Sequence, residues 1–241
     1  MKRFRHSRAG GNDGFCHDLL RSYNKRGYYT RGAVNHSHLP MDIFVLVALL
    51  AFGVHVLKSR EQKQRIALLG SYLGKFQVEK LMQDVLDGYQ RALGEADVDR
   101  QAQVWRYLEP QERTLCEQFD RFVLEFAKVP EPQARGSRLA LALPFVIQLL
   151  PVVTFDMRKL LSVHSHGISR AVANAQGHDA KRKAFTVMAE LLLMQHSCHW
   201  FCRSKLVASA RMMARHKTAY AQLLESVSPE TRRAYAAVVG Q

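Results

Sequence analysis

The residues best suited to chemistry are histidines and cysteines in two short segments, QHSCHWFC at residues 195–202 and VHSHG at residues 163–167. On a helix, His196, His199 and Cys202 follow one another at intervals of three residues, so they form one slanting stripe. Imidazole and thiolate are ligands that zinc and iron prefer. The stripe is therefore a candidate metal or haem site, which a histidine of the second segment would complete.

A structural role for the same side chains competes with the metal hypothesis. The spacing matches no familiar zinc signature such as a CxxC pair. Cys198 and Cys202 fall on an apolar helix face, where cysteine behaves as a small hydrophobic residue, and His164 also lies on an apolar face. Core packing is the favoured role, and the sequence predicts no bound cofactor.

Complete catalytic motifs are missing from the sequence, which contains no G-x-S-x-G elbow, Walker loop or H-E-x-x-H pair. Cys116 has Glu112 and Glu117 as neighbours, and negative neighbours raise the pKa of a thiol, which makes it a poor nucleophile. The carboxylates of this region are expected on a solvated helix face, paired with Arg113 and Arg121. The sequence therefore favours a non-enzymatic protein.

The elements that position these residues begin with an apolar run, IFVLVALLAFGVHVL, at residues 43–57. Its 15 residues are fewer than the roughly 17–25 that a bilayer core needs, but Met41 and the stem of Lys58 can extend it. The run predicts a membrane-anchor helix over residues 41–57. A buried core helix of a soluble bundle is the alternative, whereas a cleaved signal peptide is disfavoured because no small-residue cleavage site follows.

A basic cluster follows the apolar run directly and predicts its orientation. Lys58, Arg60, Lys63 and Arg65 lie within two helical turns of the membrane edge, and basic residues near a membrane helix stay on the cytoplasmic side. Residues 58–241 are therefore expected in the cytoplasm of a bacterium, at its inner membrane. The same four side chains are predicted to contact anionic lipid headgroups.

The first forty residues carry eight Lys or Arg and two Asp, with scattered glycines and no helical period. Such a composition buries too little apolar surface to fold, so residues 1–40 are expected to be a disordered basic tail. Residues 5–14, RHSRAGGNDG, resemble a translated bacterial intergenic palindromic repeat, which implies a bacterial source and a true start at Met41. A basic arm that touches nucleic acid or anionic lipid is the competing interpretation.

The body, residues 58–241, is predicted to be one all-α domain, a helical bundle that continues from the anchor helix. Apolar residues recur every three or four positions, and each such seam needs a partner helix. The seams comprise the following residues: Ile66, Leu69, Leu73, Phe76; Val78, Met82, Val85, Tyr89, Ala92; Leu115, Phe119, Phe122, Phe126, Val129; Val187, Leu191, Met194, Cys198, Phe201.

Capping and breaking residues predict where the helices begin and end. Asp97 and Ser228 are expected N-caps, and Pro110 is expected to open a new helix. Residues 130–138, PEPQARGSR, read as a linker between two helical halves. One long helix is expected from Asp179 to about Ser226.

A second apolar stretch, LALALPFVIQLLPVV, covers residues 139–153. Pro144 and Pro151 interrupt it, so it is too broken to span a membrane a second time. Burial between helices is the favoured prediction. A shallow position in the membrane interface is the alternative.

The C-terminal half is basic, and Arg203, Arg211 and Arg215 with His199 would line one stripe suited to phosphate. The net charge of +14 suits an anionic membrane surface, and it would also suit nucleic acid, although a nucleic-acid partner is disfavoured. The usual role of such a run is a solvated helix face.

The overall pattern, a short apolar helix followed by a basic collar and a helical body, resembles proteobacterial single-pass inner-membrane helical proteins of unknown function. The functional prediction is a membrane-anchored, non-enzymatic scaffold or interaction module, bound to the membrane through residues 43–57. Its helical seams would bind a protein partner or a second copy of the chain. The alternatives are a metal- or haem-dependent enzyme and a basic module that binds nucleic acid or anionic lipid.

Overall fold

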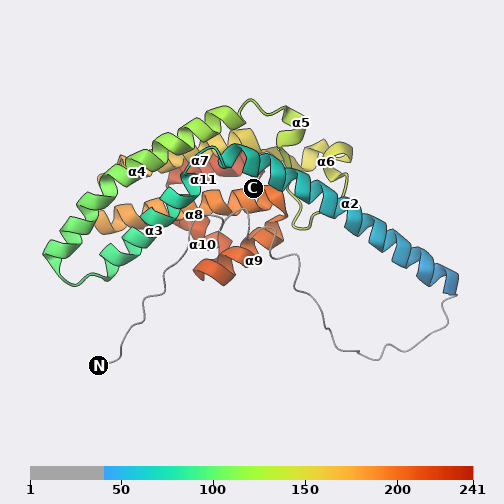
Figure 1. Cartoon of the computed structure of the whole chain (residues 1–241), viewed down its shortest axis with the longest axis horizontal. Coiled ribbons are helices and arrows are strands. Elements are labelled where there is room, and N and C mark those ends of the chain that lie inside the picture. Colours follow the sequence, from blue (N-terminus) through green and yellow to red (C-terminus); the bar gives the residue numbers. More distant parts are fainter. Residues whose placement is uncertain (1–40, 241) are drawn as a thin grey trace, which may run out of the picture.

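The protein is an all-α bundle from which one long helix projects, as the computed structural model of residues 41–240 shows (Figure 1). The predicted basic tail, residues 1–40, lies outside the described residues. The elements, in chain order, are α2 (Met41–Leu73), α3 (Val78–Gly94), α4 (Val98–Phe126), α5 (Glu131–Ala134), β1 (Arg135–Ser137), α6 (Val146–Leu149), the 3₁₀ turn η1 (Pro151–Val153), β2 (Thr154–Asp156), α7 (Met157–Val172), α8 (Ala180–Cys202), α9 (Lys205–His216), α10 (Tyr220–Ser226) and α11 (Pro229–Val239).

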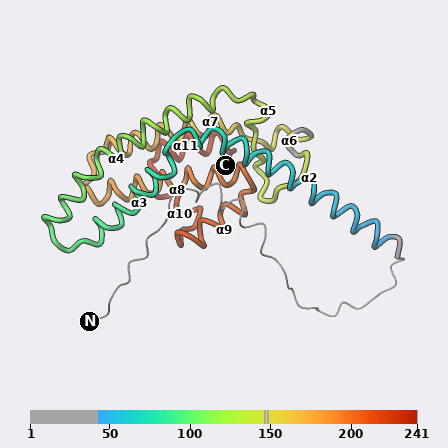
Figure 2. Tube along the Cα trace, viewed as in Figure 1, coloured from blue at the N-terminus to red at the C-terminus, as the bar shows by residue number. Residues whose placement is uncertain are grey.

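Helix α2 has two parts with different surroundings. Its first part, Ile43–Leu57, leaves the bundle, and no other described segment runs beside it in the trace (Figure 2). Its second part packs on the bundle through Ile66, Leu69 and Leu73, which are buried. The prediction of an apolar helix that continues into the bundle is confirmed.

Helix α8 is the central helix of the bundle. Its neighbours are α7, α9 and α10, and it also contacts α2 and α3. Because partners surround it on most sides, most of its side chains are buried, polar ones such as Glu190, His196 and Ser197 included. Helices α3 and α4 form an antiparallel pair, and Asp97 caps α4 as predicted by accepting the backbone N–H of Asp99 at 2.9 Å.

The predicted apolar seams are where the helices meet. Phe122 and Phe126 of α4 are fully buried, and Phe126 packs edge-on against Tyr72 of α2 at 5.5 Å and against Phe201 of α8 at 6.3 Å between ring centres. This aromatic cluster joins three helices that are distant in sequence. Burial of such large rings supplies much of the stability of a domain of this size.

Phe122→Ala is expected to lower the free energy of unfolding by about 3–4 kcal/mol, because it removes a fully buried ring and leaves a cavity among packed aromatics. Leu124→Ala is the matched control, since Leu124 is on the same helix but 67% exposed. Urea unfolding of both variants measures the difference. Equal midpoints for the two variants would contradict this assignment of the core.

Pro110 does not open a new helix, contrary to prediction, because α4 runs unbroken through it from Val98 to Phe126. The proline side chain is exposed, so the ring meets solvent and only one backbone hydrogen bond is lost. Leu108 and Leu115, on either side, are both buried on the same face of the helix. Packing of this continuous seam outweighs the local cost of the proline.

The long helix predicted from Asp179 to Ser226 is wrong, because the structure divides this region into α8, α9 and α10. Ser204 caps α9 with its hydroxyl, which accepts the N–H of Val207 at 3.3 Å. Lys217 ends α9 in the left-handed conformation, with φ of 54°. Serine competes for backbone N–H groups, so it favours a helix start over a helix interior.

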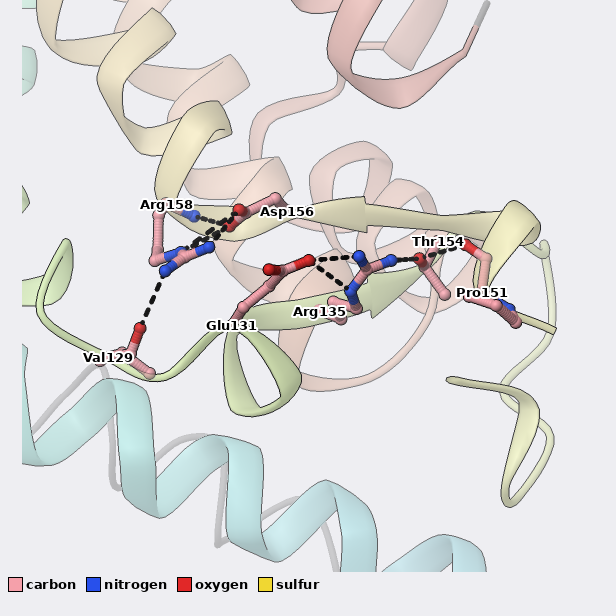
Figure 3. Close-up of polar contacts among 7 residues, drawn as sticks. All are labelled: Val129, Glu131, Arg135, Pro151, Thr154, Asp156 and Arg158. Carbon is pink, nitrogen blue, oxygen red and sulfur yellow. Dashed lines mark hydrogen bonds and ion pairs between the residues drawn. The ribbon is translucent and has the colours of Figure 1, made fainter. Parts of the chain in front are cut away.

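The predicted linker at residues 130–138 instead contains α5 and β1, and β1 pairs antiparallel with β2. Gly136 lies opposite Phe155, and a side chain on Gly136 would collide with the Phe155 ring at 2.5 Å. The two paired strands bring the ends of residues 139–153 together. Polar contacts of Arg135 and Asp156 lie along these strands (Figure 3).

The prediction that residues 139–153 are buried between helices is also wrong. Most large apolar side chains of this segment are exposed, and Leu149 is 74% and Val152 84% exposed. Pro144 and Pro151 limit the regular structure here to the one-turn helix α6 and the turn η1. So short a helix has no continuous apolar face with which to join the bundle.

Candidate functional site

The most prominent surface feature is the bare apolar part of α2. Among the described residues, one helix is long and apolar enough to cross a membrane, and the bundle does not cover its apolar part. Its exposed large apolar side chains are Ile43, Phe44, Val45, Leu46, Val47, Leu49, Leu50, Phe52, Val54, Val56 and Leu57. The alternative of a buried core helix therefore does not fit residues 43–57.

The basic cluster after this run consists of Lys58, Arg60, Lys63 and Arg65, which differ in their surroundings. Arg60 and Lys63 are exposed and Lys58 is half-buried, at the surface where α2 reaches the bundle. Arg65 instead lies against the bundle, with Nη2 3.6 Å from Glu61 Oε2, in a groove that Leu68 also lines. Arg65 is thus engaged in an ion pair with Glu61 and lies against the bundle.

The structure does not assemble His196, His199 and Cys202 into a metal site. Within the described part of the chain, no three His, Cys, Asp or Glu side chains are grouped closely enough to hold a metal ion. His196 Nε2 lies 3.0 Å from Ser209 Oγ, and the His196 ring stacks on Tyr220 at 4.5 Å between ring centres. Cys202 is buried in the apolar core.

The histidine of the second segment also has a packing role. His164 of α7 is fully buried, and its Nε2 lies 2.8 Å from Ser197 Oγ of α8. Its ring is 5.7 Å from that of Tyr235 of α11. Burial lowers the pKa of His164 to about 3, so the imidazole is neutral at pH 7 and joins three helices.

His199 and the nearby arginines form a positive region at the junction of α8 and α9. Burial and, to a smaller extent, the charges of Arg211, Arg215 and Arg203 together lower the pKa of His199 to about 4. The four residues of the stripe that the sequence predicts therefore lie close together in the structure. A concentration of guanidinium groups is suited to oxyanions such as phosphate.

A cleft of about 810 Å³ lies at the other end of the bundle from the bare part of α2. The elements around it are α3, α4, the end of α7 and the start of α8, at the left in Figure 1, where the free end of α2 is at the right. Tyr89 and Glu112 are in its floor, and Trp105 contributes an aromatic wall. The cleft thus combines aromatic and charged groups, as small-molecule and peptide sites do.

Glu112 is the central polar group of the cleft floor, and the prediction that it is solvated is wrong. It is 3% exposed, accepts the Tyr89 hydroxyl at 2.6 Å, and lies 2.5 Å from Lys183 Nζ. The signal was present in the sequence: Glu112 follows Leu108 by four residues and precedes Leu115 by three, so it occupies a position of the apolar seam. A buried carboxylate needs such partners because an unpaired charge in the interior is costly.

Cys116 lines the same cleft and is a poor nucleophile, as predicted. Burial raises the pKa of its thiol to about 11, and the charges of Asp120 and Glu112 act in the same direction. A hydrogen bond with Ser169 and the charge of Lys183 oppose this shift. At neutral pH the group is a thiol and carries no negative charge.

Alkylation of Cys116 by iodoacetamide is expected to be about 100-fold slower in the folded protein at pH 8 than in urea, because little thiolate forms when the pKa is about 11. The folded-state rate should still rise tenfold per pH unit up to pH 10. Mass spectrometry of the peptide that contains Cys116 measures it separately from other cysteines. A rate that levels off below pH 9 would contradict the raised pKa.

Comparison of the chain with protein-family models, with curated proteins and with solved structures finds no match.

Proposed function

We propose that the chain is a membrane-anchored helical interaction module, with residues 58–241 on the cytoplasmic side of a bacterial inner membrane. The observation that carries this proposal is the bare apolar part of α2, Ile43–Leu57, which packs on no part of the described bundle. Burial of apolar surface is worth about 25 cal/mol per Å². A helix satisfies its backbone internally, so the hydrocarbon core is the environment in which this segment is stable.

The basic cluster after the apolar run supports the proposed orientation. Lys58, Arg60 and Lys63 follow the apolar run at once, and they lie where α2 enters the bundle. Translocation of such a cluster is disfavoured, so the bundle stays on the side of synthesis. Contact of these side chains with anionic headgroups adds roughly 1 kcal/mol per cation.

Protease protection tests the orientation. A C-terminal epitope on the full chain is expected to survive external protease in intact spheroplasts and to be lost once the membrane is lysed. The protein is also expected to stay in the membrane pellet after a carbonate wash, which strips peripheral proteins. Loss of the epitope in intact spheroplasts would reverse the orientation, and a wholly soluble protein would refute the anchor.

The cleft supports an interaction role for the bundle. Its central carboxylate, Glu112, already binds Tyr89 and Lys183, and Cys116 is protonated at neutral pH. These groups are engaged in structure and suit non-covalent recognition better than acid–base or nucleophilic chemistry. At the end of the bundle remote from the bare part of α2, the cleft would face the cytoplasm.

A photo-crosslinking amino acid tests whether the cleft binds a partner in cells. Ala173 is exposed at the edge of the cleft, whereas Arg121 is exposed on α4 but does not line it. The probe at position 173 is expected to give a discrete adduct that the probe at position 121 does not give. The same pattern of adducts at both positions would argue against recognition in the cleft.

Binding of phosphate groups is a second candidate function, because Arg203, Arg211 and Arg215 all act electrostatically on His199. Anionic lipid headgroups are the favoured source, given the proposed anchor. Retention on anionic vesicles is expected to exceed retention on DNA at equal salt concentration, and Arg211→Gln with Arg215→Gln is expected to weaken it. Stronger retention on DNA would favour a nucleic-acid partner.

A further inference from the structure

Residues 139–153 expose more large apolar side chains than any other described segment outside the bare part of α2. These side chains are Leu141, Leu143, Phe145, Leu149, Leu150 and Val152. The segment contains no Asp, Glu, Lys or Arg. An exposed apolar surface of this kind marks a site of contact with protein or membrane.

The segment lies where the apolar run of α2 ends. The backbone N–H of Phe145 donates to Glu61 Oε1 at 3.0 Å, and Ile147 lines a groove with Leu68 of α2. Glu61 follows Leu57 by four residues, which is about one helical turn or 6 Å along the axis. Figure 1 shows α6 beside α2, on the side of the bundle from which α2 departs.

The start of α9 extends this surface. The N–H of Leu206 donates to the carbonyl of Ala140 at 3.1 Å, so α9 is joined to the segment through the backbone. Leu206 and Val207 are exposed there. The exposed apolar side chains thus come from two separate parts of the chain that a backbone hydrogen bond joins, and Arg203, just before α9, donates to Gln62 of α2 at 3.3 Å.

The length of the anchor helix explains why a second contact is useful. The 15 residues from Ile43 to Leu57 rise about 22 Å, whereas the hydrocarbon core is about 30 Å thick. The bilayer that covers the run therefore extends to the level of the following turn of α2. Residues 139–153 provide apolar side chains at that level, and Lys58, Arg60 and Lys63 provide cations for the headgroups.

Hydrogen bonds and ion pairs hold both ends of the segment on the bundle. The N–H of Arg138 donates to the carbonyl of Val153 at 2.8 Å, which closes the segment at its two ends. Arg135 reaches Glu131 and donates to Thr154 Oγ1 at 2.9 Å, as Figure 3 shows. At the other end of β2, Arg158 Nη2 lies 2.7 Å from Asp156 Oδ2, and Arg158 Nη1 donates to the Val129 carbonyl at 3.2 Å (Figure 3).

We propose that residues 139–153, together with Leu206, are a second and shallow membrane contact that inserts into the interfacial layer beside the anchor. This inference rests on the proposed function, because it requires α2 to lie in the membrane. The irregular backbone of the segment limits its depth, since unpaired N–H and C=O groups are tolerated at the interface but not in the hydrocarbon core. Together, the spanning contact and the shallow contact would fix the orientation of the bundle relative to the bilayer.

Depth-dependent quenching in the full chain tests this contact. An environment-sensitive fluorescent amino acid is placed at Val152 in one sample and at Leu124 in another, since both positions are exposed but only the first is in the segment. The proteins are reconstituted into vesicles of phosphatidylethanolamine and phosphatidylglycerol that contain spin-labelled lipids. The probe at position 152 is expected to shift to the blue and to lose more than half of its emission to a label near the headgroups, while position 124 is unaffected.

A charged variant separates insertion from mere proximity. With the probe at Leu143, the pair Leu149→Glu and Val152→Glu is expected to reduce quenching at least twofold, while thermal unfolding stays unchanged because both side chains are exposed. The protein should remain in the vesicle pellet, since α2 still anchors it. A pelleted protein with no quenching at position 152, or a dimer in detergent that buries this probe instead, would overturn the shallow contact and leave the anchor intact. A protein absent from the pellet would refute the anchor itself.

Discussion

Replacement of Leu49 and Leu50 by arginine is expected to release the protein from the membrane into the soluble fraction. At the centre of a spanning helix, leucine favours insertion by about 0.5 kcal/mol, whereas arginine opposes it by about 3 kcal/mol. Two replacements therefore cost about 7 kcal/mol. The run has only 15 apolar residues, fewer than a full span needs, so its total free energy of insertion is small. The cost of the two arginines is expected to exceed the favourable insertion free energy of the remaining residues.

The released protein is expected to stay folded. Both leucines are more than half exposed and are part of the segment that the bundle does not cover. Helical circular dichroism and the unfolding midpoint of the variant should match those of the parent protein in detergent. Leu49→Ile with Leu50→Ile is the control and should remain in the membrane pellet after a carbonate wash.

Retention of the arginine variant in the washed pellet would show that the apolar run is not what holds the protein. Release with loss of structure would show that residues 43–57 contribute to the core. Either result would refute the assignment of α2 as an anchor.

Periodicity was sufficient to predict the core of the bundle. Tyr89, Phe122 and Leu191 belong to three different seams that were read from the spacing of apolar residues, and all three are buried. Such positions are predictable because a helix must bury one face and the face repeats every three or four residues. The N-cap at Asp97 was predictable for a similarly local reason, since its side chain bonds its own helix.

Interactions between distant segments explain the errors. The break at Ser204 is the exception, because its cap is local and serine favours a helix start over a helix interior. Glu112 occupies a position of the apolar seam, but burial of its carboxylate depends on Tyr89 and Lys183, which come from other helices. Hydrophobicity alone predicts that residues 139–153 lie in the core, because it does not distinguish a core from an exposed apolar surface.

The candidate metal ligands illustrate the same ambiguity. The spacing of His196, His199 and Cys202 describes one face of a helix equally well for a metal site and for a core. The partners of His196 are Ser209 and Tyr220, on helices whose position the spacing does not encode. What the structure adds is a buried pair of neutral imidazoles, His164 and His196, whose pKa values are both lowered to about 3, mainly by burial.

These two histidines are expected to make the protein sensitive to mild acid. In the unfolded chain each imidazole binds a proton below about pH 6.5, whereas in the folded protein it does so only near pH 3. Their stabilising contribution is therefore fully present above pH 6.5 and is lost as the pH falls toward 3. Between pH 7 and pH 5 the loss is roughly 2 kcal/mol for each histidine, or about 4 kcal/mol for the pair.

Comparison with a double variant isolates this contribution, because other groups also titrate. Burial raises the pKa of Glu79 to about 7 and also raises that of Glu190, and a carboxyl that binds its proton more tightly when folded gains stability as the pH falls. The measured quantity is thus the change in unfolding free energy between pH 7 and pH 5, taken in detergent for the parent and for His164→Gln with His196→Gln. The parent should lose about 4 kcal/mol more than the variant over this interval. If the two proteins instead show the same pH dependence, the two imidazoles bind their protons at about the same pH in the folded and in the unfolded protein, and they are not neutral partners of Ser197 and Ser209 at pH 5.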